Sequence, residues 1–340
     1  MTGISLVLPA DLATCISTHG SLDSGMRSLT GDSRSTSGLD AVLATIASVV
    51  TDAVEKHPAT RGQPLSAIAF RKIWVGMAGY DRQVLMPLIN NAISNLFCSS
   101  PKAGLRISSD IDLLPAALAS YADIASIIVL VVGTGSVAMN YQRNGRSFRR
   151  TGRLGGWGKV FGDDGSGYAI GREGIRATLR HCDLHNLTSN GDDKKPAFGA
   201  LPQAILAHFQ QSAPGIGPDS LLDHLLVPEP AQGESTDIAR TKAIASAASV
   251  VLSVASKDPE AGRIAQSGAI DVAALVRTLV AAQHVDVARC ALVLGGGLMA
   301  NLMYREAICG MISEDCGEFS QVRTISEPAI AGAEYLVNER

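Results

Sequence analysis

The sequence has few aromatic residues and no concentrated charge of either sign. Its 340 residues include only 2 Trp, 6 Tyr and 7 Phe, which leaves few rings for stacking on nucleic-acid bases. Lys and Arg number 29 and Asp and Glu 32, for a net charge of −3. A protein that binds nucleic acid usually carries a basic stripe or patch, so we expect no nucleic-acid partner.

Paired cysteines are also lacking. No two of the six form a CxxC motif; they are Cys15, Cys98, Cys182, Cys290, Cys309 and Cys316. Scattered thiols of this kind predict neither a disulfide framework, nor a tetrahedral zinc site, nor an iron–sulfur cluster. We expect most of them to be small buried residues in a protein of a reducing compartment.

Long hydrophobic runs are missing as well. The longest, at residues 127–132, is far below the roughly 20 residues of a membrane-spanning helix. The first 17 residues have no basic segment, and their apolar stretch is broken at Pro9, which argues against a signal peptide. These absences predict a cytoplasmic protein with no membrane partner.

What is present is enough apolar sequence for large cores. Hydrophobic residues make up 46% and charged residues 18%, and at roughly 100–200 residues per domain the length predicts two domains. Hydrophobic periodicity predicts alternating strands and helices, hence an α/β fold. The expected strands are 67–76, 104–110, 127–132 and 291–294; the expected helices are 38–54, 82–97, 111–122, 168–181, 200–211, 239–256, 259–269 and 298–309.

A glycine turn follows the most apolar strand. It reads Gly133, Thr134, Gly135, Ser136, and its backbone amides could approach a phosphate closely. The stretch also fits the dinucleotide pattern G-x-G-x-x-A, but that pattern needs a helix directly after the glycines. The Asn-Gly pair at residues 144–145 predicts a β-hairpin instead. A phosphate loop and an ordinary glycine-rich turn both remain open.

A second glycine turn, Gly295, Gly296 and Gly297, lies between another strand and a helix. This arrangement lets a nucleotide lie against the backbone and the helix N-terminus. No Walker A sequence is present, so the two turns favour a nucleotide held in a cleft rather than by a P-loop. They favour phosphoryl transfer over redox chemistry.

Carboxylates near these turns are candidates for catalysis and sugar binding. Asp110 follows a strand and could accept a hydroxyl proton, whereas Asp112 is better explained as a helix cap. Asp163 and Asp164 lie in a glycine-rich loop, GDDGSG, where fixed carboxylates could hold sugar hydroxyls. Trp157 in GGWG is either a ring exposed in a tight loop or a core anchor.

Metal ligands are not identified by the sequence. His181 and His185 have the i, i+4 spacing of a helical metal pair, but no supporting motif such as HExxH accompanies them. We interpret both as polar residues near a helix end.

Five motifs in order resemble a known family. They are VGMAGYDR (75–82), SSD (108–110), IIVLVVGTGS (127–136), GGWGKVFGDDGSGY (155–168) and LVLGGG (292–297). Together they resemble the N-acetylglucosamine kinases of the BadF/BadG/BcrA/BcrD ATPase group, within the actin-like sugar kinase superfamily. The resemblance runs from about residue 38 to residue 334.

The resemblance implies an α/β protein of two actin-like (ribonuclease H-like) domains flanking a cleft for ATP and sugar. The N-terminal domain would cover residues 1–125, with a helix at 329–340 packing back on it, and the C-terminal domain residues 126–328. ATP and Mg²⁺ would be the cofactors, the partner would be N-acetylglucosamine or a related amino sugar, and a homodimer is compatible with the family.

The same resemblance implies a role for each site residue. Asp110 would bind the sugar and take the proton from its 6-hydroxyl group. The remaining roles are phosphate binding by Gly133, Thr134, Gly135 and Ser136, adenosine binding by Ala245, Gly295 and Gly296, and amino-sugar binding by Gly156, Trp157 and Asp163.

One departure from the family pattern concerns the first domain. Family members open with a strand and the turn D-G-G-G-T, but here the counterpart of the following strand lies at residues 6–17 and no such turn precedes it. The family's sugar-contacting Asn would fall near Ser33 and Arg34, where no Asn stands. Either the chain start is incomplete or the protein has lost part of its ATP-binding site, and the second case makes an impaired binding protein an alternative to an active kinase. A further alternative is an ATPase activator of the same family, which shares the fold. The activator is disfavoured because the cysteines offer no convincing pair for a bridging cluster.

Overall fold

The structure is a computed structural model in which the chain forms two compact units. It describes residues 2–7, 13–18, 37–56, 58, 60–64, 67–68, 70, 72–77, 80, 83–97, 104–188, 198–228, 230 and 235–338. Unit 1 consists of Met1–Ile124, Gln142–Arg149 and Ile325–Arg340, and unit 2 of Ala125–Tyr141 and Arg150–Thr324. Ser33 and Arg34, and Gly79 and Asp81 of the motif at 75–82, lie outside the described residues.

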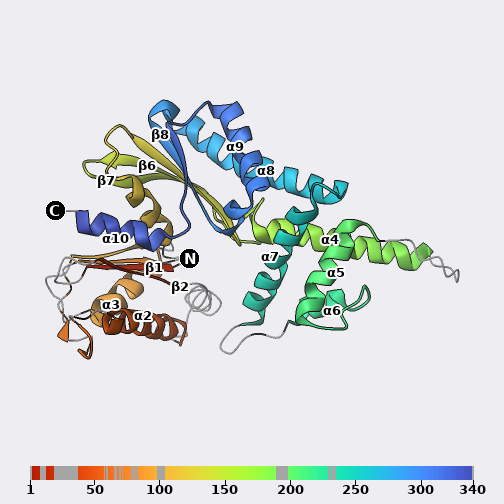
Figure 1. Ribbon diagram of the computed structural model, residues 1–340, viewed down its shortest axis with the longest axis horizontal. Helices are drawn as coiled ribbons and strands as arrows, with labels where there is room; N and C mark the ends of the chain where they lie inside the picture. The colour runs from red at the N-terminus through yellow and green to blue at the C-terminus, as the bar shows by residue number, and fades with distance from the viewer. Residues whose placement is uncertain are drawn as a thin grey trace. The chain divides into compact units, whose positions relative to one another are not determined.

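Unit 1 contains a four-stranded sheet of order β2-β1-β3-β4 (Figure 1). Its strands are β1 (Thr2–Val7), β2 (Ala13–Thr18), β3 (Lys72–Met77) and β4 (Gly104–Ser109). β1 runs antiparallel to both β2 and β3, and β3 runs parallel to β4. The sheet is therefore mixed.

Side chains of β3 alternate between two cores, as the twofold period of a strand dictates. Ile73, Val75 and Met77 belong to a core that includes buried residues of α2 (Ser37–Lys56) and α3 (Met86–Leu96). Trp74 belongs to a second cluster, with Leu113 of the 3₁₀ helix η2 (Asp110–Leu118) and Leu336 of α10 (Pro328–Asn338). The helix α10 thus returns to unit 1, and the Trp74 and Tyr335 rings meet edge to face at 5.9 Å between centroids.

A five-stranded sheet of order β7-β6-β5-β8-β9 belongs to unit 2, except for the tip of its β6–β7 hairpin at Gln142–Arg149, which is counted with unit 1. The strands are β5 (Ser126–Val132), β6 (Ser136–Asn144), β7 (Ser147–Gly155), β8 (Cys290–Gly295) and β9 (Gln321–Thr324). β5 and β8, and β8 and β9, pair in parallel. In this sheet β5 separates the hairpin strand β6 from β8, whereas in unit 1 the hairpin strand β1 pairs directly with β3.

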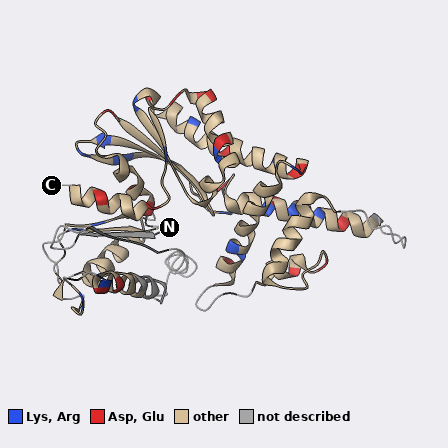
Figure 2. Ribbon diagram, in the orientation of Figure 1, with Lys and Arg blue, Asp and Glu red and all other residues tan. Residues whose placement is uncertain are grey.

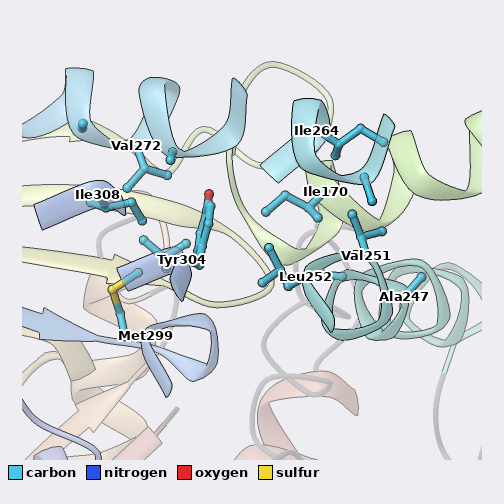
Figure 3. Packing of buried hydrophobic residues seen from close by; sticks show 14 of the residues in the cluster. Ile170, Ala247, Val251, Leu252, Ile264, Val272, Met299, Tyr304 and Ile308 are labelled. Atoms are coloured by element: carbon cyan, nitrogen blue, oxygen red, sulfur yellow. The ribbon is translucent and has the colours of Figure 1, made fainter. Parts of the chain in front are cut away.

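Helices supply the rest of unit 2 and bury its largest core. They are α4 (Gly167–Thr188), α5 (Ala200–Ser212), α6 (Leu221–Leu226), α7 (Thr236–Val254), α8 (Pro259–Ala282), η3 (Val287–Arg289), η4 (Gly297–Ala300) and α9 (Leu302–Cys316). Figure 3 shows Ile170 of α4, Leu252 of α7, Val272 of α8 and Tyr304 of α9 converging on this core.

The Asp258 side chain joins the starts of two of these helices. Its Oδ1 accepts hydrogen bonds from the backbone N–H groups of Glu260 (3.0 Å) and Ala261 (3.2 Å) in the first turn of α8. Its Oδ2 accepts from the N–H of Leu201 in α5 at 2.9 Å. One buried carboxylate therefore satisfies N-terminal donors of both helices.

Several predicted elements differ from the observed ones. The predicted strand 67–76 is shorter and begins at Lys72. The predicted helix 111–122 is a 3₁₀ helix that begins at Asp110 and contains Pro115, whose ring cannot continue an α-helical hydrogen-bond ladder. The predicted helix 298–309 is split, because the Asn301 side chain accepts from Tyr304 N–H (3.0 Å) and caps a new helix.

The helix α8 extends to Ala282, well past the predicted end at residue 269. Within the described residues it is the one helix long and apolar enough to cross a membrane. Its residues Ala261, Ile264, Val272 and Val276 are buried in the core of unit 2. These buried residues place one face of α8 in the core of unit 2.

The expectation that most cysteines are buried holds for two of the four whose side chains are described, and charged residues of both signs lie on the same helix. Figure 2 shows acidic and basic residues interspersed along α4, where Arg176 pairs with Glu173 at 3.0 Å. Among the cysteines whose side chains are described, Cys182 and Cys290 are buried and Cys309 and Cys316 half-buried, and all four are free thiols.

Candidate active site

The first glycine turn rests on the start of α4. Gly133 N–H donates to the Gly135 carbonyl at 2.9 Å and closes the turn between β5 and β6. The carbonyls of Gly133 and Thr134 accept hydrogen bonds from Gly167 N–H (2.7 Å) and Tyr168 N–H (3.2 Å). Because these donors belong to the first turn of α4, the helix and the glycine turn fix each other's position.

The second glycine turn lies beside the first. Gly296 has φ of +93°, and a Cβ there would overlap the backbone of Val132 at the end of β5. A Cβ on Gly133 would lie 3.8 Å from Gly297 N. The structure thus brings the two predicted nucleotide turns together at the carboxyl ends of neighbouring parallel strands, where α/β sheets commonly present ligand groups.

Ser136 connects the first turn to the loop at residues 156–166. Its carbonyl accepts from Gly156 N–H at 2.8 Å, and its Oγ donates to the Asp164 carbonyl at 2.8 Å. Ser136 N–H donates to Asp163 Oδ1 at 3.5 Å. Asp163 has φ of +62°, a left-handed backbone conformation that is uncommon for residues other than glycine.

The Asp163 carboxylate lies directly against Gly135. A Cβ added to Gly135 would lie 2.8 Å from Asp163 Oδ2, so a side chain at residue 135 would collide with the carboxylate. A glycine at residue 135 therefore leaves the space that the Asp163 carboxylate occupies beside the turn.

Trp157 is exposed, which decides the choice that the sequence left open. Its side chain is 64% exposed, and Val160 and Phe161 in the same loop are 75% and 81% exposed. A Cβ on Gly162 would lie 3.1 Å from Trp157 Cε3, so the ring lies over a glycine of its own loop. The ring is not a core anchor.

Ala245 joins the same region through its backbone. A Cβ on Gly167 would lie 3.0 Å from the Gly133 carbonyl oxygen and 3.5 Å from the Ala245 carbonyl oxygen. The site residues predicted in unit 2 therefore lie on neighbouring turns, strand ends and the middle of α7; they are Gly133, Thr134, Gly135, Ser136, Gly156, Trp157, Asp163, Ala245, Gly295 and Gly296.

Asp110 belongs to unit 1 and is the first residue of η2, directly after β4. Its Oδ1 accepts from Ile111 N–H (3.0 Å) and Ser109 Oγ (3.3 Å). Burial raises the pKa of Asp110, although these hydrogen bonds act in the opposite direction. Two residues on, Asp112 Oδ2 accepts from Ser109 N–H at 3.2 Å in a capping box, which confirms its predicted role as a helix cap.

Two residues that hold the 156–166 loop were not found from the sequence. Lys159 Nζ donates to Asp237 Oδ1 at 2.7 Å and to Thr241 Oγ1 at 2.5 Å, both on α7. Tyr304 of α9 donates from its buried hydroxyl to the Gly165 carbonyl at 2.7 Å. A lysine in an otherwise apolar stretch is the one local signal for the first, and the second has none.

The described side chains offer few ligands for a metal ion. No group of three or more His, Cys, Asp or Glu that could hold a metal ion occurs among the described residues, so His181 and His185 do not form such a site. Mg²⁺ bound with a nucleotide takes one or two carboxylates together with phosphate oxygens and water. The carboxylate of Asp163 beside the glycine turn fits that smaller requirement.

Two curated relatives that are named as kinases match part of the chain. The N-acetylmuramic acid/N-acetylglucosamine kinase of Clostridium acetobutylicum is 34% identical over 111 residues, 33% of each chain. The N-acetyl-D-glucosamine kinase of Dictyostelium discoideum is 32% identical over 108 residues, 32% of this chain and 31% of its own. The matched part spans about a third of the length of these curated relatives.

Solved structures and a family model match nearly the whole chain. A candidate N-acetylglucosamine kinase from Porphyromonas gingivalis has a TM-score of 0.53 at 18% identity, covering 86% of this chain and 85% of that one. One from Chromobacterium violaceum has a TM-score of 0.52 at 19% identity, covering 88% and 86%. Both show the α/β fold alone. The family model of the BadF/BadG/BcrA/BcrD ATPases matches residues 32–334, and the chain belongs to that family.

Proposed function

We propose that the protein is an ATP-dependent sugar kinase that phosphorylates N-acetyl-D-glucosamine, or a related amino sugar, at the 6-hydroxyl group. The observation that carries the proposal is the meeting of the two glycine turns with Asp163 and the exposed Trp157 in one region of unit 2. Membership of an ATPase family supports ATP as the phosphoryl donor, and the two curated relatives act on amino sugars according to their names.

The nucleotide would occupy the glycine turns. Backbone amides of Gly133–Ser136 would bind phosphate oxygens, and Gly295, Gly296 and Ala245 would line the adenosine site. Bound Mg²⁺ would neutralise phosphate charge, and the Asp163 carboxylate beside the first turn would help to hold it.

The amino sugar would lie against Gly156, Trp157 and Asp163. An exposed indole ring offers an apolar face to the C–H groups of a pyranose, and a fixed carboxylate accepts hydrogen bonds from its hydroxyls. Asp110 would accept the proton of the 6-hydroxyl while that oxygen bonds to the γ-phosphorus and the bond to ADP breaks. Its raised pKa makes it a stronger base than an ordinary aspartate.

The cellular setting follows from the proposed reaction. ATP and free thiols are features of the cytoplasm, so we place the protein there, with an amino sugar as its partner. No nucleic-acid or membrane partner enters the proposal, and a homodimer stays a prediction.

The direct test is ADP release coupled to addition of N-acetylglucosamine, with glucose and N-acetylmuramic acid in parallel. We expect turnover with an amino sugar and a loss of turnover in Asp110→Asn. No turnover with any of these sugars, or an unchanged rate in Asp110→Asn, would overturn the proposal.

The second candidate is a binding protein with impaired catalysis. Residues 1–340 contain no D-G-G-G-T turn, and this candidate applies if no such turn precedes them in the whole protein. Loss of several phosphate-binding amides and an acidic metal ligand would slow the reaction on the order of thousands-fold. Titration calorimetry that detects sugar or nucleotide binding without turnover would favour this candidate, whereas normal turnover would exclude it.

A further inference from the structure

The loop at residues 156–164 exposes its apolar residues, whereas its one cation is only partly exposed. Trp157, Val160 and Phe161 are each more than 60% exposed, as given above, yet the Lys159 side chain between them is only 22% exposed. Its ammonium group contacts Asp237 and Thr241 of α7 and lies 5.8 Å from the centre of the Tyr168 ring. The lysine points inward where its neighbours point outward.

The contact uses the chemistry of an ammonium group. Asp237 lies in the first turn of α7, where the helix dipole favours a negative charge. Thr241 donates its own hydroxyl proton to the Asp237 carbonyl at 2.7 Å, so its oxygen is left to accept from Lys159. Two acceptors one helical turn apart suit a group that carries three N–H donors.

Lys159 also attaches the middle of the loop to another element, α7. The ends of the loop are tied to Ser136 through Gly156 N–H and the Asp164 carbonyl. Between them, Phe161 N–H (3.1 Å) and Gly162 N–H (3.0 Å) both donate to the Gly158 carbonyl. These bonds shape the turn but do not attach it to another element.

The helix face that receives Lys159 continues toward the nucleotide turns. Asp237, Thr241 and Ala245 follow one another at i, i+4 and i+8 and therefore share a face of α7. The Ala245 carbonyl lies close to Gly167, next to the Gly133 turn. A contact at one end of this face thus connects the Trp157 loop to the helix that reaches the predicted adenosine site.

We propose that Lys159 is a positioning residue that latches the 156–164 loop to α7 and thereby sets the position of Trp157 for the sugar. The sugar part of the proposal rests on the proposed function, whereas the latch itself does not. The two parts can be tested separately.

The latch is tested by the fluorescence of Trp157 in the full-length protein. Trp74 is 2% exposed, so acrylamide quenches Trp157 selectively. We expect Lys159→Met to lower the anisotropy of the quenchable emission and to raise its quenching constant, by up to about twofold. Lys159→Arg keeps a cation that can reach Asp237 and should restore most of the signal. The matched control is Arg277→Met, which removes another ion pair of unit 2, Arg277–Asp315 at 2.9 Å. Fluorescence of Lys159→Met that matches the Arg277→Met control would overturn the latch.

The effect on sugar binding is tested by steady-state kinetics with N-acetylglucosamine. We expect Lys159→Met to raise the KM for the sugar about tenfold with kcat changed less than about twofold, because a ground-state position is lost rather than the chemistry. Asp237→Asn should act in the same direction, and the double variant should be no worse than the more severe single one. Changed fluorescence with an unchanged KM for the sugar would overturn the sugar part alone. A wild-type protein without kinase activity would contradict the proposed function and leave the fluorescence test of the latch intact.

Discussion

Two aspartates only two residues apart illustrate how the environment assigns different roles to the same side chain. Asp112 accepts a hydrogen bond from the backbone of its own helix start, and Asp110 is partly buried with a raised pKa. The sequence predicted the cap because Asp112 falls inside the first helical turn, whereas the role of Asp110 as a base stays a prediction. The sequence left the exposure of Trp157 open, and it did not predict the partners of Lys159, since Asp237 and Thr241 lie far away in the chain.

Replacing Asp110 with Asn should remove the proposed base, because a side-chain amide does not accept the proton, and it keeps the size of the side chain. We expect kcat for amino-sugar phosphorylation to fall by roughly 10²–10⁴-fold, with little change in the melting temperature. Asp112→Asn is the matched control: it should weaken the capping box and lower stability by about 1 kcal/mol at most, with kcat largely preserved. Steady-state kinetics and thermal denaturation of both variants would distinguish the two roles, and equal losses of kcat would contradict the assignment.

The pH dependence of the reaction should report the raised pKa of Asp110. A base must be deprotonated, so activity is present above its pKa and is lost as the pH falls through it. Because burial raises this pKa, the acidic limb of the kcat/KM profile should lie above the ordinary Asp value of about 3.9. Circular dichroism at each pH would exclude unfolding as the cause, and a limb at or below the ordinary value would count against Asp110.

Gly135→Ala tests the close approach between the glycine turn and Asp163. The added methyl would lie 2.8 Å from Asp163 Oδ2, so the carboxylate must move or the turn must open. We expect at least a tenfold loss of kcat/KM, because positioning at a reacting centre tolerates little displacement. Gly310→Ala is the control, since a Cβ at this helical position meets no atom within 4 Å. Comparable kinetics in the two variants would show that Asp163 is not constrained in this way.

Elements with local sequence signals were predicted more accurately than elements whose bounds depend on a cap or a proline. The strand 127–132, the Asn-Gly hairpin and the helix at 200–211 were predicted nearly as observed, because their signals are local: an apolar run, a turn dipeptide and a periodic stripe. The prediction of one continuous helix after the second glycine turn was wrong, because the Asn301 side chain caps a new helix there. The η2 helix differed for a similar local reason, Pro115.

Asp258 offers the sharpest test at this scale. Asp258→Ala would leave three N-terminal N–H groups of α5 and α8 without their acceptor, so we expect a loss of about 2–3 kcal/mol in the free energy of unfolding. Asp286→Ala, which removes a single hydrogen bond to Ala288 N–H at the start of η3, should cost well under half as much. Urea denaturation of the two variants would measure the difference.

The contribution of Asp258 should also depend on pH. Burial alone would raise the pKa of Asp258, but the hydrogen bonds from Leu201, Ala261 and Glu260 outweigh it, and the pKa lies below its ordinary value. The stabilisation is therefore present above the unfolded-state pKa of about 3.9 and is lost as the pH falls through the lower folded-state value. The stability gap between wild type and Asp258→Ala should narrow in acid.

At the scale of the whole molecule, each unit has its own core and its own sheet. The mixed α/β architecture was predictable from the alternation of strands and helices, and it agrees with the fold of the solved structures. The direct pairing of β1 with β3 was not predictable, because it joins segments separated by more than fifty residues. The predicted loss of the opening strand stays a prediction.

Unit 1 should depend on α10 for its stability. Leu336 is 4% exposed and packs with Trp74 and Leu113, so Leu336→Ala should cost about 2–4 kcal/mol. Its neighbour Val337 is 39% exposed, and Val337→Ala should cost less than about 1 kcal/mol. Hydrogen exchange followed by mass spectrometry should show that Leu336→Ala speeds amide exchange in β3 more than in β5, each relative to the wild type. Equal increases in both strands would contradict the assignment of α10 to unit 1.

The return of α10 to unit 1 has a consequence for biosynthesis. The strands of unit 1 leave the ribosome early, but the helix that covers Trp74 is made only after residues 125–324. At about 5–20 residues per second, those 200 residues take roughly 10–40 s to translate. During this interval η2 can already cover part of the face that carries Trp74, but the place of α10 stays open. The first unit to begin synthesis is therefore the last to finish folding, and chaperones have that time to bind it.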